Sequence, residues 1–282
     1  KADLSNTSFK NTNIDGARFV FANLNNSNLL DRTDLSNINL AGTDLSNVSL
    51  KGKDLSGAYL TYADLSEHDL TGTNLTGVNL LYANLPEGNL PDSLVNNNFN
   101  HAKLTNINFA GKDLSGSSFR LAELESSNMQ NTNLSDTDFV EVDLTKIKNK
   151  SLAGADLSEA SFAHSNLSGV NLAGTILHTT NFWKTNLSGV DFTVTDVITD
   201  GLTFIEAILP NSNFEGVDLS PKEQYFQVFQ NKAHLKNLHA LDLAENLLSS
   251  GHNIFIISTE VRGNDLAVTY LFYNNFALAN LE

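Results

Sequence analysis

Large apolar residues recur at every fifth position along most of the chain. The clearest stretch is an unbroken series of leucines that starts at Leu35 and ends at Leu90. The spacing extends beyond this stretch to Leu4 and Leu219, and nearly every centre is Leu or Phe. The exceptions are also apolar: Ile14, Met129 and Val197. A period of five matches neither the period of an α-helix nor that of a β-strand, so one helix or sheet would scatter these side chains over every face. The chain must therefore turn regularly to bring them into one core.

Each apolar centre lies in a five-residue unit of constant character. Two residues before the centre the side chain is usually small, as in Ala58, Ala63 and Ala83. Asp or Asn precedes the centre, Ser or Thr commonly follows it, and Gly or Asn often comes next. These polar residues and glycine favour turns through local hydrogen bonds and tolerance of unusual backbone angles. The units predict a chain that turns a corner every five residues, with the centre and the small residue inside.

Units such as ADLSN, ANLNN, TDLSN and TNLTG closely resemble the A(D/N)LXX pattern of the pentapeptide-repeat family, over about residues 1–219. The resemblance implies an all-β solenoid, a right-handed quadrilateral β-helix with one pentapeptide per side and four per coil. Stacked coils would pair their backbone groups as neighbouring strands do. Four units per coil predict about 11 coils, and residues 220–282 would add a small C-terminal α/β module.

The phenylalanine centres provide a test of the four-unit coil. Residues 20 apart should stack on one side of the solenoid, and a loop after Leu144 would let the series continue beyond it. The expected ladder consists of Phe99, Phe119, Phe139, Phe162 and Phe182, with Phe109 and Met129 on the opposite side. Such a column is expected to be hydrophobic core rather than a cofactor site.

The spacing changes at four places. Short bulges are expected near residue 30, at 145–151 and at 203–208, and a larger loop at 86–98, which holds two prolines and three consecutive asparagines. The loop at 145–151 carries Lys146, Lys148 and Lys150. These lysines are interpreted as solvated surface or, alternatively, as a contact for an acidic partner.

Residues 220–282 depart from the repeat. Ser220 and Glu223 form a capping box with proline between them, which predicts the start of a helix. Apolar residues at 254–257 and 266–273 predict a β-hairpin. The module is interpreted as a cap over the end of the solenoid, because an open end exposes apolar centres and unpaired backbone. It could instead be an insertion, since the repeat spacing resumes at 276–281.

Two further interpretations concern a partner and the extent of the chain. The C-terminal module could bind a partner protein through Tyr225, Phe226 and Phe229. Both ends of the chain resemble repeat sequence, so we expect a fragment of a longer protein.

Composition limits the chemistry. The net charge of −15 argues against gripping nucleic acid or docking on anionic lipid. The chain has no cysteine, which removes disulfides, thiolate metal sites and cysteine nucleophiles. The seven histidines make no HExxH motif or paired metal spacing, and the phosphate-binding and nucleophile-elbow glycine motifs are missing. We therefore expect no enzymatic activity, no cofactor, no metal site and no membrane insertion.

Three basic residues occupy the inward position that usually holds a small residue: Lys53, His68 and Lys112. Counting units back by one coil places Asp92 in the inward position next to Lys112. One interpretation is a partly buried ion pair between the two. The other is that these sides bow outward and the lysines reach water.

Two functions follow as hypotheses. The first is a rigid, non-catalytic protein-interaction scaffold, part of a larger bacterial protein such as a secreted effector. The second, which the family resemblance implies, is an acidic DNA mimic that binds a type II topoisomerase such as gyrase and protects it, as quinolone-resistance relatives do. Without a signal peptide in the chain, the bacterial cytoplasm and a host cell are both open as locations. The sequence identifies neither the partner nor the oligomeric state.

Overall fold

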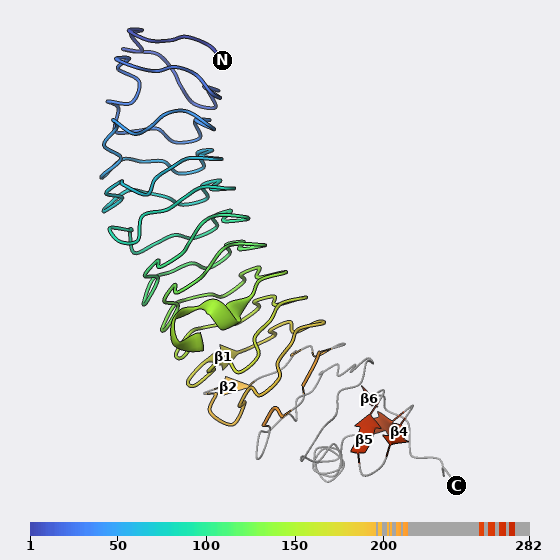
Figure 1. Cartoon of the computed structure of the whole chain (residues 1–282). Coiled ribbons are helices and arrows are strands. Elements are labelled where there is room, and N and C mark those ends of the chain that lie inside the picture. Colours follow the sequence, from blue (N-terminus) through green and yellow to red (C-terminus); the bar gives the residue numbers. More distant parts are fainter. Residues whose placement is uncertain are drawn as a thin grey trace. The chain divides into compact units, whose positions relative to one another are not determined.

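The computed structural model (Figure 1) describes residues 1–195, 197–198, 202, 204, 207–209 and 211–213, and four short strands between residues 254 and 273. Backbone pairing in the repeat region is parallel and joins residues 20 apart, as in Asp54 with Asn74. Each coil thus pairs with the next along its edge. This arrangement satisfies backbone groups between coils, as in a parallel sheet.

Four turns divide each coil. The carbonyl oxygens of Leu55, Leu60, Leu65 and Leu70 each accept a hydrogen bond from the backbone N–H three residues later, at 2.9 to 3.1 Å. The next centre, Leu75, then lies one coil beyond Leu55, whose N–H donates to the carbonyl of Asn74. The predicted coil of four pentapeptides is confirmed.

In many of the turns the third residue has a left-handed backbone conformation. Gly57 has φ of 66° and Asn37 has φ of 56° at equivalent corners. A positive φ at this position is the mark of a type II turn and favours Gly and Asn. The Asp or Asn before each centre supports the corner as well, since Oδ1 of Asp54 accepts the N–H of Ser56 at 3.0 Å. The polar residues of the repeat therefore form the corners.

The apolar centres fill the inside of the coils. Leu55, Leu60 and Leu65 are completely buried, and so is the small residue Ala58 beside them. Burying a leucine side chain contributes roughly 1.5–3 kcal/mol relative to leaving it exposed. Repeated in every unit, this burial is the main source of stability for a chain whose sides are too short to form long strands.

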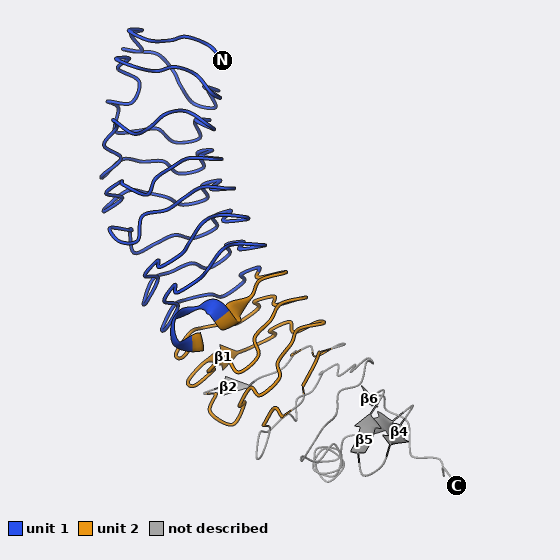
Figure 2. Ribbon diagram, in the orientation of Figure 1, with its two compact units in different colours: residues 1–138, 146–149 blue, residues 139–145, 150–282 orange. Residues whose placement is uncertain are grey.

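The chain divides into two compact units (Figure 2). Unit 1 comprises residues 1–138 and 146–149, and unit 2 comprises residues 139–145 and 150–282. The same coil builds both, with Asp54 paired to Asn74 in unit 1 and Asn166 paired to Asn186 in unit 2.

Few residues form longer elements. Two 3-10 helices, η1 (Leu144–Lys146) and η2 (Lys148–Lys150), lie where the sequence predicts a bulge at 145–151. Strands β1 (Ile176–Leu177) and β2 (Val197–Ile198) pair in parallel. Within the described part of the chain, no helix has the length and apolar character needed to cross a membrane.

The pairing offset changes close to the predicted interruptions. Arg18 pairs with Asn39, one residue more than the usual offset, and Asn79 pairs with Asn98, one fewer. Within unit 2, the pairing of Asp143 with Asn166 accommodates three additional residues. Each change leaves the coils on either side in register, because the extra or missing residue falls between paired segments.

Four short strands lie near the C-terminus. Strand β3 (Ile254–Ile256) pairs antiparallel with β6 (Leu271–Tyr273), and β4 (Thr259–Arg262) pairs antiparallel with β5 (Asp265–Val268). The sequence predicted two strands here, at 254–257 and 266–273. The structure divides the same region into four. The predicted helix after Ser220 and the repeat-like segment 276–281 lie outside the described residues.

Candidate functional site

Phenylalanine rings stack inside unit 1. The rings of Phe99 and Phe119 have centroids 5.0 Å apart and planes 19° apart. Phe109 meets both rings edge-on, with centroids at 6.4 Å. All three side chains and Met129 are completely buried. Rings closed off from solvent in this way offer packing energy and no ligand-binding face.

A second stack lies inside unit 2. Phe139 stacks on Phe162 at 5.2 Å, Phe162 on Phe182 at 5.6 Å, and Phe182 on Phe204 at 5.3 Å. Counting four five-residue units on from Phe182 gives Leu202 as the centre at the last of these positions, and the ring stack places Phe204 there instead. Both residues are apolar and buried, so the five-residue spacing alone selected the wrong one.

Register explains this difference. Val197, which the sequence assigned as a centre, pairs with Ile176, the residue before the centre Leu177. One additional residue has therefore entered the coil before Val197. Asn186 pairs with Ile208, which accounts for a second. The sequence had placed both additional residues later, at 203–208.

Two of the inward basic residues bind backbone carbonyl groups. Nζ of Lys53 donates to the carbonyl oxygen of Arg32 at 2.8 Å, and Nε2 of His68 lies 3.0 Å from that of Leu45. Both residues are only 9% exposed. Thr73 donates from its hydroxyl in the same way. Lys53 and His68 thus extend a structural role of the inward polar residues, because buried carbonyl groups need donors.

Three buried polar atoms of the described residues lack a hydrogen-bond partner, and the third, after those of His68 and Asn97, is Oγ of Ser27. Because a carbonyl oxygen only accepts, the ring of His68 must donate from Nε2 to Leu45. Among the described residues, Nδ1 of His68 and Nδ2 of Asn97 are buried without a hydrogen-bond partner. Oδ1 of Asn97 accepts from the N–H of Val78 at 2.7 Å. The sequence analysis missed Asn97, although an asparagine at the small inward position was the signal.

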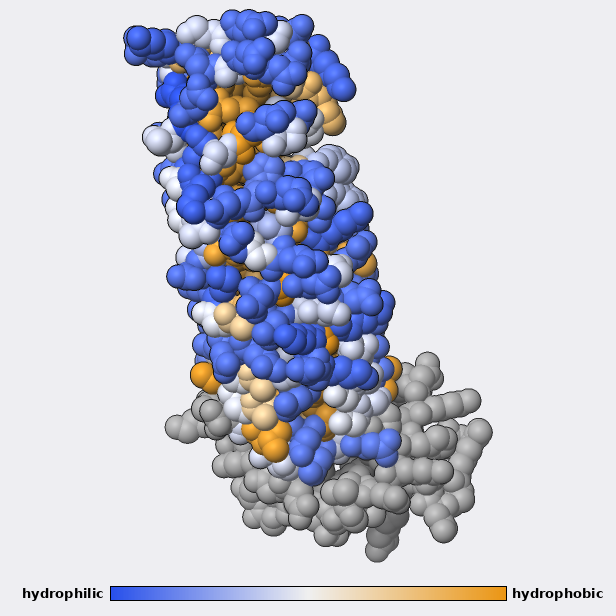
Figure 3. Space-filling model, turned by 60° about the vertical axis from the view of Figure 1, so that its left-hand side comes forward, coloured by the Kyte–Doolittle hydropathy of each residue, from blue (hydrophilic) through white to orange (hydrophobic). Residues whose placement is uncertain are grey.

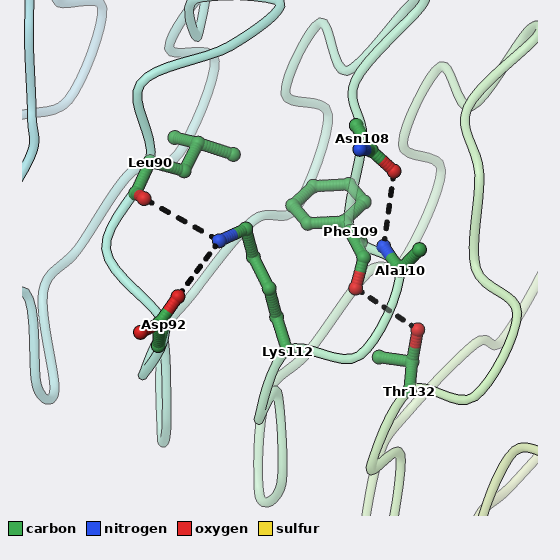
Figure 4. A network of polar contacts seen from close by, with 7 residues as sticks. All are labelled: Leu90, Asp92, Asn108, Phe109, Ala110, Lys112 and Thr132. Carbon is green, nitrogen blue, oxygen red and sulfur yellow. Dashed lines mark hydrogen bonds and ion pairs between the residues drawn. The ribbon is translucent and has the colours of Figure 1, made fainter.

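Lys112 reaches both a carbonyl and a carboxylate (Figure 4). Its Nζ lies 3.4 Å from the carbonyl oxygen of Leu90 and 3.3 Å from Oδ1 of Asp92. The Lys112 side chain is 16% exposed, whereas that of Asp92 is fully exposed. The predicted inward position of Asp92 is therefore wrong, since its carboxylate keeps its hydration and Lys112 extends to meet it.

The polar contacts around Lys112 belong to the framework (Figure 4). Oδ1 of Asn108 accepts the N–H of Ala110 at 3.2 Å, and the hydroxyl of Thr132 donates to the carbonyl of Phe109 at 3.1 Å. These are the corner and inward contacts that recur in other coils. Nothing about them distinguishes a reaction centre.

The remaining predicted residues divide into two groups. Lys146, Lys148 and Lys150 are exposed, on η1 and η2. The predicted partner-binding aromatic residues lie outside the described residues: Tyr225, Phe226 and Phe229.

Exposed carboxylates keep their charge at neutral pH. A backbone hydrogen bond from Ser46 lowers the pKa of Asp44, and the hydroxyl and N–H of Ser66 lower the pKa of Asp64. Lys51 donates to Asp69 at 2.7 Å and lowers the pKa of that carboxyl to about 2. Within the described part of the chain, no group of three or more His, Asp or Glu side chains is placed to hold a metal ion. The acidic residues act as a charged surface.

One corner of unit 1 carries an exposed column that the sequence analysis missed. We call it the aromatic column because four of its six members have aromatic side chains. The members are Phe21, Gly42, Tyr62, Tyr82, His101 and Leu121. Backbone hydrogen bonds between coils set its register. The N–H of each of the first five members donates to the carbonyl oxygen of the residue that precedes the next member. The signal was the residue two positions after the centre, where an aromatic side chain replaced the usual Gly or Asn.

Rings in the aromatic column stack on the outside of the coils. Tyr62 and Tyr82 have centroids 5.0 Å apart and planes 4° apart, and Tyr82 and His101 have centroids 4.6 Å apart. Tyr62 is 60% exposed and Tyr82 is 44% exposed. The face of the molecule in Figure 3 is mostly hydrophilic, with hydrophobic residues visible between polar ones.

Comparisons with known proteins agree with the coil. A family model described as pentapeptide repeats matches the chain in eight copies. The matched ranges are residues 1–29, 30–52, 54–90, 98–136, 117–147 and 155–193. A comparison with curated proteins found no match.

The solved structures that are similar to the chain include HetL and QnrB1. HetL, a pentapeptide repeat protein involved in heterocyst differentiation regulation from the cyanobacterium Nostoc sp. strain PCC 7120, is 27% identical over 74% of this chain and 87% of its own, with a TM-score of 0.32. QnrB1, a plasmid-mediated fluoroquinolone resistance protein, is 20% identical over 54% of this chain and 84% of its own, with a TM-score of 0.22. Because both TM-scores are low, the fold rests on the pairing between coils and on the family match.

Proposed function

The chain belongs to the pentapeptide-repeat family, and on that premise we propose that it is a non-catalytic protein-interaction scaffold. The observation that carries the proposal is the fixed register of the surface. Corner side chains such as Tyr62 and Tyr82 are spaced by backbone hydrogen bonds between coils rather than by flexible loops. A surface organised in this way needs little ordering on binding, which removes one of the main costs of association.

The test is direct binding with a matched surface variant. Partners retained by the immobilised chain would be identified, purified and titrated against it by calorimetry. The control variant replaces the exposed, non-glycine corner residues of three neighbouring coils by Asn and leaves the buried centres unchanged. We expect a measurable affinity for the natural chain, loss of binding in the variant, and similar melting temperatures for both. Equal binding by both proteins would contradict the proposal.

Several finer points belong to the same proposal. We expect about 11 right-handed coils over 1–219, with residues 220–282 as a cap, an insertion or a binding module that uses Tyr225, Phe226 and Phe229. Lys146, Lys148 and Lys150 would offer a contact to an acidic partner. We also propose that the chain is part of a larger bacterial protein, such as a secreted effector, that acts in the bacterial cytoplasm or in a host cell.

An acidic DNA mimic is the second candidate. The net charge of −15 favours it, together with surface carboxylates such as Asp44 and Asp64 whose lowered pKa values keep them ionised. Such a surface would compete with DNA for a basic saddle on a type II topoisomerase. A supercoiling assay with purified gyrase tests this candidate. Unchanged supercoiling and no protection from a quinolone at micromolar protein would exclude it.

A further inference from the structure

The aromatic column keeps bulky side chains in a backbone conformation that disfavours them. Tyr62 has φ of 62°, Tyr82 of 58° and His101 of 55°. Elsewhere in unit 1, the left-handed positions hold Gly, Asn, Ser126 or Asp136. Large side chains at positive φ are strained, and such strain gathers at functional sites. In unit 2 such positions also hold Glu141, His164 and Lys184, so it is the stacking of the rings on one another that singles out the corners of the aromatic column.

Tyr62 ends the ring stack on an open side. One face of its ring lies against Tyr82, with planes 4° apart. The next corner in the column on the other side is Gly42, whose N–H donates to the carbonyl of Thr61 at 3.0 Å and which has no side chain. A Cβ on Gly42 would overlap the ring of Phe21, so that ring leans over the glycine. Within unit 1, the only ring that contacts Tyr62 is that of Tyr82, and Tyr62 is 60% exposed. One face of Tyr62 is therefore available for stacking.

Two carboxylates follow the corners at Gly42 and Tyr62. Asp44 and Asp64 come two residues after Gly42 and Tyr62, on neighbouring coils, and both are exposed. Ser46 and Ser66 donate hydrogen bonds to them, which lowers the pKa of both carboxyls. Lys103 is a cation on the same side of the coils, reached from Asp64 through two successive pairings by way of Asn84. Arg18 is a second cation, reached from Tyr59 through two successive pairings by way of Asn39. Along the chain, the charged residues nearest to the corners at Gly42 and Tyr62 are nevertheless carboxylates.

An aromatic face with carboxylates two residues along the chain suits one kind of ligand. A guanidinium group is planar and cationic, stacks on tyrosine and forms hydrogen bonds to carboxylates. Nucleic acid fits poorly, because its phosphates would meet Asp44 and Asp64. A second copy of the chain also fits poorly, because each copy carries a net charge of −15.

We propose that Tyr62, Asp44 and Asp64 form a docking site for an arginine side chain on an extended, basic segment of a partner protein. The proposal rests on the scaffold function and names the chemistry of its partner. The arginine stacks on the open face of Tyr62 while the carboxylates hold its charge. Tyr82 and His101 support the ring from behind.

Fluorescence anisotropy with defined peptides tests the site on the full chain. The probe is a labelled peptide of alternating arginine and serine, about ten residues long and extended in solution. In one control peptide citrulline replaces arginine, which keeps the plane and removes the charge, and in another glutamate replaces it. We expect saturable binding of the arginine peptide alone, weakened as NaCl rises from about 0.05 M to about 0.5 M.

Four variants connect the binding to the site. Tyr62→Asn places the usual corner residue at Tyr62 and should weaken binding about 2- to 5-fold, the range of an exposed cation–aromatic contact. Tyr62→Phe keeps the ring and should bind as the natural chain does. Asp44→Asn combined with Asp64→Asn keeps the corner hydrogen bonds and should weaken binding by a similar factor. Tyr59→Asn is the matched control, because Tyr59 is 47% exposed and pairs with asparagines in both neighbouring coils.

Several results would overturn the site. These are no saturable binding up to about 1 mM peptide, equal binding of the citrulline or glutamate peptide, and an unchanged affinity in Tyr62→Asn. Self-association seen by sedimentation and abolished in Tyr62→Asn would also overturn it, in favour of a second copy as occupant. None of these results decides the scaffold function, which is tested with a purified partner and a different set of variants.

Discussion

Asn133 donates a hydrogen bond from Nδ2 to Oδ1 of Asp113, one coil away, at 3.0 Å. The same oxygen of Asp113 accepts the N–H of Ser115 at 3.1 Å. One side-chain oxygen therefore closes a corner and connects two coils. This explains why Asp and Asn alternate freely before the centres, since both provide that oxygen and only the amide also donates.

Replacing Asp113 by Asn should leave stability nearly unchanged, within about 0.5 kcal/mol, because the acceptor oxygen remains. Replacing Asp113 by Ala removes the acceptor for both hydrogen bonds and should lower the free energy of unfolding by about 1 kcal/mol. Urea denaturation of the two variants measures the contrast. Equal losses in both would show that the corner oxygen has no structural role.

Truncating Phe119 to Ala should lower the free energy of unfolding by about 3–5 kcal/mol, as for other buried phenylalanines. The ring is completely buried and stacks on Phe99 at 5.0 Å, so its removal leaves a cavity between coils. Equilibrium unfolding measures the loss. A value below about 1 kcal/mol would contradict the position of Phe119 inside the coil.

Replacing Asp92 by Ala should not change the melting temperature measurably. Its side chain is fully exposed, and an exposed ion pair contributes little. Replacing Lys112 by Ala should lower stability by roughly 1 kcal/mol, because its stem packs inside the coil and its amine approaches the carbonyl of Leu90. Differential scanning calorimetry compares the two. A larger effect of the Asp92 change would restore the buried ion pair as an interpretation.

The ion pair between Lys51 and Asp69 should make stability depend on pH in the acid range. Its hydrogen bond lowers the pKa of Asp69 from 3.8 to about 2 in the folded chain. A lowered folded-state pKa contributes stability above pH 3.8, and this contribution is lost as the pH falls towards 2.

The melting temperature of Asp69→Asn, measured from about pH 6 to pH 2, tests this linkage. The natural chain should melt at a higher temperature than the variant at pH 6, and most of the difference should be lost by about pH 2. Added salt should reduce the difference at pH 6, since both partners are exposed. A difference that is the same at every pH would contradict it.

The sequence predicted the coil and its corners because both depend on local chemistry. Leu55 and Leu60 had to be inside, and Asp54 had to support a turn, whatever lay in the next coil. The ring stack that includes Phe99 and Phe119 follows from counting units. The choice of Phe204 over Leu202 does not follow, because two buried apolar residues satisfy the same pattern and only the ring of Phe182 selects between them.

The sequence by itself determined regular turns, apolar centres and an acidic, cysteine-free composition, and the four-sided coil followed from its resemblance to pentapeptide repeats. The tertiary structure decided what depends on the distance between coils. The stack of Tyr62, Tyr82 and His101 exists because neighbouring coils bring residues about 20 positions apart to ring-stacking distance. The exposure of Asp92 and the contact of His68 with the carbonyl of Leu45 also depend on neighbouring coils. Their surroundings come from other coils, and no local pattern contains them.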